Sequence, residues 1–331
     1  MIAPEIDPAT FHADVQYIES LWQPVTVGDV DLPLIDTGKP EADPLVFVPI
    51  LEHLEFVYAR QIRAFSRTRR VIMYRRQEAR TRPVGLAERA EELRRLLDAL
   101  ELERVDLVGH GDAAMVLFEF AERWPQRCRR LIIVAQGADY RIAPHPFIWL
   151  LHELFLRVPV EYVLPAWLLR RIVIRYIVAR KQGRAATAPA TDVVDDSVPA
   201  GASTNLNSTQ DSGLRTQNST QPPVCRLPRA LIEEQFRKIG RWPFVYKFSV
   251  LPIIHYFDMR QRLGSLTMPI LLINRTDDVL SPEHKTRRLA GLLPNCIGYH
   301  VIPGGERFFM YTQAETVNAV IEQALTMAQE C

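Results

Sequence analysis

The chain has 331 residues, of which 47% are hydrophobic and 24% are charged. This is an ordinary composition for a folded globular protein, and the length suffices for one α/β domain with an insertion. Forty basic residues against 39 acidic ones give a formal net charge of +1. Such a balance argues against a protein built mainly to bind nucleic acid, so we expect no nucleic-acid partner.

The four cysteines are scattered and show neither a metal-site spacing nor a C-x-x-C motif. Charge or proline interrupts every long apolar stretch before the roughly 20 residues that a bilayer span needs. Residues 1–19 also lack the basic-then-apolar order of a signal peptide. We therefore expect a cytoplasmic protein with free thiols, no metal and no cofactor.

Eight strands are predicted along the chain. Two short ones, Val25–Val27 and Asp31–Asp36, flank a turn at Gly28 and favour a hairpin. Short continuous apolar runs, which are typical of strands buried on both faces, predict the other six. These runs are Pro44–Ile50, Arg70–Tyr74, Val105–Val108, Leu131–Val134, Ile270–Ile273 and Gly298–Ile302.

Helical patterns separate these strands. Leu86–Leu100 carries apolar residues three or four positions apart, and Asp112–Trp124 ends before Pro125. Pro282–Leu293 begins with a proline in its first turn, and Glu315–Ala328 is predicted as the last helix. Alternation of strands and helices predicts a mostly parallel sheet with helices on both faces.

The segment Val105–Trp124 is predicted as a strand, a sharp glycine-rich turn and a helix. It resembles the nucleophile elbow of the α/β-hydrolase superfamily, G-x-S-x-G. Its five positions are filled by Gly109, His110, Gly111, Asp112 and Ala113. Further segments resemble the superfamily's oxyanion loop, acid loop and histidine loop: residues 44–53 (PLVFVPILEH), 274–284 (NRTDDVLSPEH) and 301–310 (VIPGGERFFM).

The resemblance implies a degenerate catalytic triad. The nucleophile position falls on Gly111, which has no side chain, and the acid position on Asp277, with Asp278 beside it. The histidine position falls on Arg307, or on Glu306 if the loop shifts by one residue. Arginine cannot act as a base near neutral pH. The nucleophile and the base of the superfamily are therefore both missing from their usual positions.

The oxyanion loop departs from the superfamily as well, because Pro49 and Ile50 replace its usual His-Gly pair. Together with His110 and Asp112, these two residues are our candidates for contacts with a ligand. His110 is expected to pack rather than to catalyse. Asp277 and Arg307 could pair across the two loops and fill the space of the usual Asp–His pair.

Two interpretations of Asp112 are open. Haloalkane dehalogenases of this superfamily attack with an aspartate at the elbow, but one residue earlier. The alternative, which we favour, is a carboxylate that complements the dipole at the N-terminus of a helix. If Asp112 were a relocated nucleophile, the base would be a histidine: His53, His255 or His300.

Two surfaces allow both a functional and a structural interpretation. Residues 60–82 contain nine arginines, which could bind phosphate or anionic lipid, or form a solvated face balanced by the acidic residues of 88–103. Residues 147–181 combine aromatic and aliphatic side chains with arginines. They could rest on a membrane, or pack as a cap over the core, which we favour.

The domain organisation follows from the resemblance and from composition. We expect an N-terminal extension (1–19), a first core segment (20–142), a helical cap (143–257) and a second core segment (258–331). Residues 183–226 within the cap are rich in small and polar residues, repeat Asn-Ser-Thr-Gln, and are predicted to be disordered.

The sequence thus predicts an α/β-hydrolase-like protein that is non-catalytic. It would bind a small apolar ligand or a protein partner between core and cap. The alternative is an active hydrolase for an ester, epoxide or haloalkane, with relocated groups near Asp112. A third hypothesis is a peripheral membrane contact through the cap.

Overall fold

A computed structural model describes residues 4–28, 30–38, 43–79, 81–139, 146–158, 225–242, 244–276, 278, 280–304 and 306–327, together with 165, 167, 168 and 171. The predicted disordered insertion lies almost entirely outside these residues. No helix in the described ranges is both long and apolar enough to cross a membrane.

One eight-stranded sheet forms the centre of the molecule, in the order β1-β2-β4-β3-β5-β6-β7-β8. Its strands are β1 (Gln23–Val27), β2 (Val30–Asp36), β3 (Leu45–Phe47), β4 (Val71–Tyr74), β5 (Val105–His110), β6 (Cys128–Val134), β7 (Ile270–Arg275) and β8 (Cys296–Ile302). Pairing is antiparallel from β1 through β2 to β4 and parallel across the rest. All eight predicted strands and the mostly parallel sheet are confirmed.

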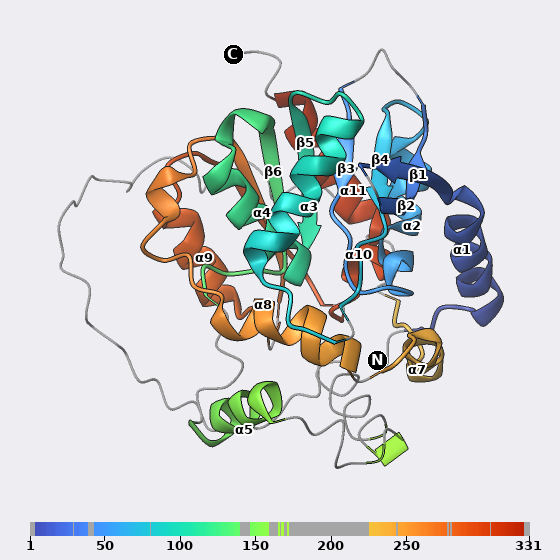
Figure 1. Ribbon diagram of the computed structural model, residues 1–331. Coiled ribbons are helices and arrows are strands. Elements are labelled where there is room, and N and C mark those ends of the chain that lie inside the picture. Colours follow the sequence, from blue (N-terminus) through green and yellow to red (C-terminus); the bar gives the residue numbers. More distant parts are fainter. Residues whose placement is uncertain are drawn as a thin grey trace.

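Helices cover both faces of the sheet (Figure 1). On one face lie α3 (Leu86–Ala99) and α4 (Asp112–Arg123); on the other lie α2 (Ala59–Phe65), α10 (Phe309–Thr312) and α11 (Ala314–Met327). The helix α9 (Glu283–Leu292) packs against β7 and β8. The four helices predicted from the sequence correspond to α3, α4, α9 and α11.

The helix α1 (Pro8–Leu21) belongs to the segment predicted as an N-terminal extension. Asp7 caps it by accepting a hydrogen bond from the Thr10 amide at 3.0 Å, and Pro8 occupies its first turn. Phe11 and Ile18 are buried, and the Phe11 ring packs edge-on against Phe56. The structure therefore attaches this segment to the core, because its apolar side chains are buried there.

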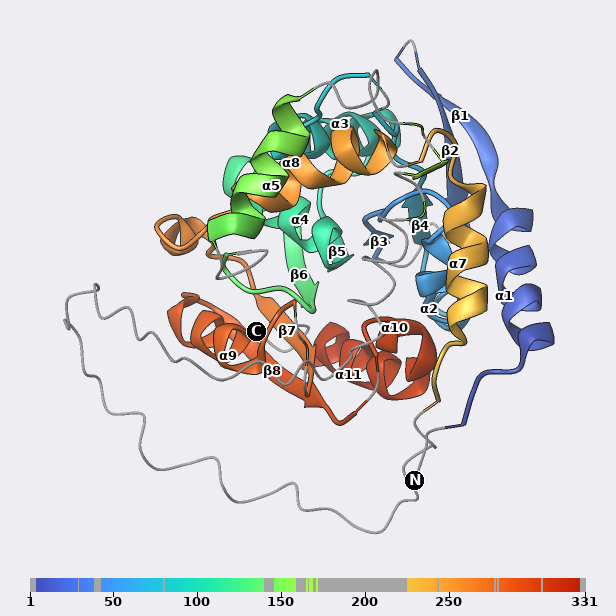
Figure 2. The same cartoon turned by 90° about the horizontal axis from the view of Figure 1, so that it is seen from below.

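The segment predicted as a cap contains α5 (Pro146–Arg157), α7 (Arg229–Lys238) and α8 (Leu251–Tyr256), the last preceded by a π-helical turn at Tyr246–Val250. Figure 1 shows α5 and α8 beneath the end of the sheet at which β5 and β6 terminate. Figure 2 shows α7 beside α1, where His12 Nε2 lies 3.0 Å from Glu234 Oε2. These helices flank the edge of the sheet that carries the predicted elbow.

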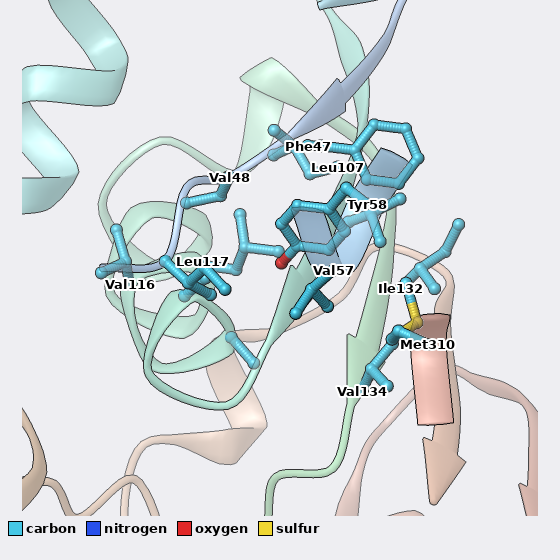
Figure 3. Packing of buried hydrophobic residues seen from close by; sticks show 14 of the residues in the cluster. Phe47, Val48, Val57, Tyr58, Leu107, Val116, Leu117, Ile132, Val134 and Met310 are labelled. Carbon is cyan, nitrogen blue, oxygen red and sulfur yellow. The ribbon is translucent and has the colours of Figure 1, made fainter. Parts of the chain in front are cut away.

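The core beneath that edge is closely packed. Tyr58 is fully buried beside Phe47, with ring centroids 5.2 Å apart (Figure 3). Its hydroxyl accepts a hydrogen bond from the backbone N–H of His110 at 3.1 Å. Burial raises the pKa of this phenol well above its usual value, so Tyr58 acts as a neutral anchor for the end of β5.

Candidate functional site

The turn between β5 and α4 has the backbone of an elbow. Gly111 has φ 63° and ψ −119°, which L side chains adopt only with strain and which glycine adopts without steric cost. Its amide donates to the carbonyl of Val134 at 3.0 Å and holds the turn at the end of β6. Glycine at position 111 therefore allows this turn without strain and carries no side chain into the space in front of it.

Gly109 lets α4 return close to β5. A Cβ on this residue would lie 2.8 Å from the amide nitrogen of Ala114, closer than real Cβ atoms approach backbone. Any larger residue at position 109 would push the helix away from the strand. The first glycine of the elbow is thus required by helix–strand packing.

Arg307 occupies the space in front of the elbow. A side chain at position 111 would begin 3.1 Å from the Nη2 atom of Arg307. The other terminal nitrogen, Nη1, donates to Asp278 Oδ1 at 3.2 Å and Oδ2 at 3.4 Å. Both side chains are buried, with 7% of the Arg307 side chain and none of the Asp278 side chain exposed. A guanidinium therefore lies next to the position from which a nucleophile would project.

Asp278 also organises the loop that carries it. Its Oδ1 accepts hydrogen bonds from the amides of Leu280 and Ser281, both at 2.8 Å, and its Oδ2 accepts one from Arg275 Nε at 3.2 Å. The predicted partner of Arg307, Asp277, lies outside the described residues. The carboxylate that the structure pairs with Arg307 is the neighbouring one.

Asp112 points toward the end of β4. Its Oδ2 accepts a hydrogen bond from Arg76 Nη1 at 2.8 Å, and Arg76 Nε donates to Glu78 Oε1 at 2.7 Å. Burial alone would lower the pKa of Arg76, but the carboxylates of Glu78 and Asp112 raise it above its usual value. Asp112 lies in the first turn of α4 yet does not cap it, because its carboxylate is held by Arg76.

Comparisons with known proteins bear on the fold of the chain. Over 48 residues the chain is 46% identical to 2-hydroxy-6-oxo-2,4-heptadienoate hydrolase of Pseudomonas putida strain F1, a match that covers 14% of this chain and 17% of that enzyme. No protein-family model matches the chain.

Solved structures match nearly the whole length. The enol-lactonase of Burkholderia xenovorans LB400 aligns with a TM-score of 0.65 at 16% identity, covering 92% of this chain and all of that one. Bromoperoxidase of Bacillus anthracis aligns with a TM-score of 0.62 at 16% identity, covering 92% of this chain and 99% of that one. A carboxylesterase of Bacillus subtilis aligns with a TM-score of 0.62 at 15% identity, covering 97% of this chain and 98% of that one.

The chain has the α/β-hydrolase fold.

The remaining candidate ligand contacts of this α/β-hydrolase-fold protein lie at the same end of the sheet. Pro49 and Ile50 follow β3, and both are buried. His110 ends β5, is 5% exposed, and packs edge-on against Phe309 with centroids 6.1 Å apart. The predicted packing of His110 agrees with this contact, and its role in ligand binding stays a prediction.

The three histidines proposed as relocated bases lie on separate elements. His53 is in the loop after β3 with φ 63°, and His300 is half-buried in β8, where burial lowers its pKa. His255 is buried in α8, with its Nε2 atom 2.8 Å from Glu153 Oε2 on α5. That imidazole thus links α8 to α5.

Glu306, the alternative residue at the histidine position, is buried beneath the strand-like segment that precedes α7. Its Oε1 accepts the Leu227 amide at 2.5 Å. Burial raises the pKa of Glu306 to about 7, although the bond from Leu227 and the charges of Arg226 and Arg275 oppose the rise. The carboxyl ties the loop after β8 to the segment that leads into α7.

The arginine run of residues 60–82 is largely neutralised by ion pairs. Within the described residues, seven arginines of the run pair with carboxylates: Arg60 and Arg63 with Asp14, Arg69 with Glu322, Arg70 with Asp36, Arg75 with Glu19 and Glu55, Arg76 with Glu78 and Asp112, and Arg82 with Glu88. Of these partners, Glu88 belongs to the acidic segment of residues 88–103 and the others lie elsewhere in the chain. This pattern favours a structural role for the run.

No group of three or more histidine, cysteine, aspartate or glutamate side chains in the described residues could hold a metal ion. Sequence reasoning missed two members of the site, Arg76 and the pairing of Asp278. The available signal for Arg76 was its position two residues after a predicted buried strand, at the edge where the parallel strands end.

Proposed function

We propose that this α/β-hydrolase-fold protein does not catalyse hydrolysis and instead binds a small molecule with an apolar body, or a protein partner, between the core and the cap. The observation that carries the proposal is the guanidinium of Arg307, 3.1 Å from the point at which a side chain at position 111 would begin. Acyl transfer needs a nucleophile and a base in hydrogen-bonding reach. The chain offers glycine and an ion-paired arginine at those positions.

The ion pair between Asp112 and Arg76 argues against the alternative of a relocated aspartate nucleophile. A nucleophilic carboxylate has to turn toward the substrate and form a bond to it. One oxygen of Asp112 is engaged at 2.8 Å by a buried arginine that the Glu78 carboxylate also holds. Displacing Asp112 from this pair would leave a buried guanidinium with less compensation.

Hydrolysis of p-nitrophenyl butyrate tests the proposal. We expect the purified folded protein to hydrolyse this ester no faster than buffer alone, and we expect the same of Asp112→Ala. The double variant Gly111→Ser with Arg307→His should gain hydrolysis above buffer, because it places a nucleophile and a base at one elbow. Neither single variant should turn over, since each lacks one of the two groups. Turnover by the unmodified protein that disappears in Asp112→Ala would overturn the proposal.

A membrane contact through the cap is a second candidate. Leu150 and Leu154 lie four residues apart on α5, and Val158 continues this spacing just after the helix ends; the three side chains are 40–47% exposed, beside the exposed Arg157. Sedimentation with vesicles containing anionic lipid tests it. Binding should fall in Leu150→Glu with Leu154→Glu; equal sedimentation of this variant and the unmodified chain would reject the candidate.

A further inference from the structure

A buried carboxyl holds the segment that leads into α7. Glu306 lies in the loop after β8 and is 3% exposed, and its Oε1 accepts a hydrogen bond from the Leu227 amide at 2.5 Å. Leu227 is fully buried, and α7 begins two residues later and lies beside α1 (Figure 2). The other carboxyl oxygen, Oε2, is enclosed and has no hydrogen-bond partner within the part of the chain that the structure describes. A single oxygen of Glu306 thus bonds the loop after β8 to the segment before α7.

The segment before α7 also pairs with residues near the N-terminus. The amide of Arg226 donates to the carbonyl of Pro4 at 2.8 Å, and the amide of Ile6 donates to the carbonyl of Arg226 at 2.9 Å. These two bonds form an isolated parallel bridge between Glu5 and Arg226. An isolated bridge lacks the neighbouring pairs of a sheet, so it opens more readily than the strands of the core. The attachment of the segment therefore depends on the bond to Glu306.

The charged groups around Glu306 are engaged with other carboxylates. If Glu306 ionised in place, its charge would be enclosed with one amide bond, which is costly. Burial therefore raises the pKa of Glu306 to about 7; the nearby positive charges oppose this rise, and the charge of Glu5 adds to it. The nearest guanidiniums are bonded as follows: Arg226 to Glu5 at 3.0 Å, Arg275 to Asp278 at 3.2 Å, and Arg307, the next residue in the chain, to Asp278 at 3.2 Å.

We propose that Glu306 is a pH-sensitive latch for residues 225–228. With a proton on Oε2, the carboxyl buries no charge and its Oε1 keeps the bond from Leu227. When that proton leaves to solvent, the carboxylate gains more from hydration than from one amide bond, and it reaches water when the segment opens. The closed form is favoured most below pH 4.5, and opening increases as the pH rises to about 7. The inference concerns the attachment of this segment and does not depend on what the chain binds.

Amide hydrogen exchange of the full chain, measured by NMR and corrected for intrinsic exchange rates, tests the latch. The three amides that it protects belong to Ile6, Arg226 and Leu227. Their opening should rise at least about tenfold from about pH 5 to about pH 7, because the carboxyl ionises near 7 when closed and near 4.5 when open. They should exchange faster than the amides of β5, since the opening is local. In Glu306→Gln, which keeps an acceptor for Leu227 without a charge, opening should change less than about threefold.

Two matched variants separate the latch from neighbouring groups. Glu5→Gln removes the exposed carboxylate that is bonded to Arg226, and His12→Gln removes the imidazole that lies 3.0 Å from Glu234 on α7. Both variants should keep the rise, because Glu306 is unchanged in them. No rise in the unmodified chain, a rise that persists in Glu306→Gln, a rise that vanishes in His12→Gln, or exchange of the three amides only as slowly as in β5 would each overturn the inference.

Discussion

Replacing Glu306 by glutamine should change how the stability of the fold depends on pH. The carboxyl is 3% exposed, its Oε1 accepts the Leu227 amide, and its Oε2 has no hydrogen-bond partner in the described residues. Burial raises its pKa from an ordinary 4.5 to about 7. Glutamine has the same shape and can still accept from Leu227, but it carries no charge to bury.

The sign of this pH dependence follows from the upward shift of the Glu306 pKa. A carboxyl whose pKa is higher in the folded state favours folding most when both states are protonated, below about pH 4.5. That contribution is lost as the pH rises to about 7 and beyond, because ionisation is then easier in the unfolded chain. The interval from 4.5 to about 7, at about 1.4 kcal/mol per pH unit, gives a loss of about 3 kcal/mol.

Urea unfolding at a series of pH values from about 5 to about 8 measures the effect. Two other buried carboxyls with raised pKa values, Glu55 at about 7 and Asp106 at about 6, add their own pH dependence to the unmodified chain. The informative quantity is therefore the difference between the unmodified chain and Glu306→Gln. That difference should move in favour of the variant as the pH rises. Glu315→Gln, at an exposed carboxylate, should show no such change. Parallel curves for Glu306→Gln and the unmodified chain would refute the reasoning.

Two further substitutions test the packing and the charge network of the site. Gly109→Ala should destabilise the fold by about 2 kcal/mol or more, because its methyl group would overpack against the backbone of α4. The control Gly264→Ala adds its methyl group in open space and should cost less than about 0.5 kcal/mol. Thermal unfolding compares the two variants, and equal costs would contradict the close approach of α4 to β5. Arg76→Met should lower the free energy of unfolding by about 3 kcal/mol, because it leaves the buried Glu78 carboxylate with less compensating positive charge. Arg82→Met removes an exposed ion pair and should cost less than about 1 kcal/mol. An Arg76 variant as stable as the Arg82 variant would show that this network does not stabilise the fold.

The inner strands β3 to β7 were predictable because nearly all their residues are buried. Runs such as Ile270–Ile273 contain no polar residue, and only a buried strand or a buried helix accommodates such a run. The elbow was predictable for a different reason, since closely spaced glycines between a strand and a helix permit few backbone conformations. Helix α1 was missed because its apolar residues, including Phe11 and Ile18, are sparse and are buried by distant segments such as α2.

The partners within the site could not be predicted, because they depend on side-chain direction rather than on sequence spacing. Asp277 and Asp278 are adjacent in sequence, and no pattern distinguishes which of them faces Arg307. The structure describes Asp278 in that place, where two loop amides and two guanidiniums bind one carboxylate. Similarly, Arg76 is one arginine among nine in its segment, and only the fold places it against Asp112.

The glycine at the elbow and the arginine in front of it are best understood together. With serine at position 111, the Oγ would lie beyond a Cβ that is already 3.1 Å from Arg307 Nη2, so the guanidinium would have to move. Any such movement strains its bonds to Asp278, which also orders the loop through Leu280 and Ser281. A change at position 111 alone therefore conflicts with the ion pair, and a change at position 307 alone leaves a buried carboxylate with one guanidinium fewer. Because each residue suits the other, placing a serine and a histidine at this elbow without strain requires both positions to change at once.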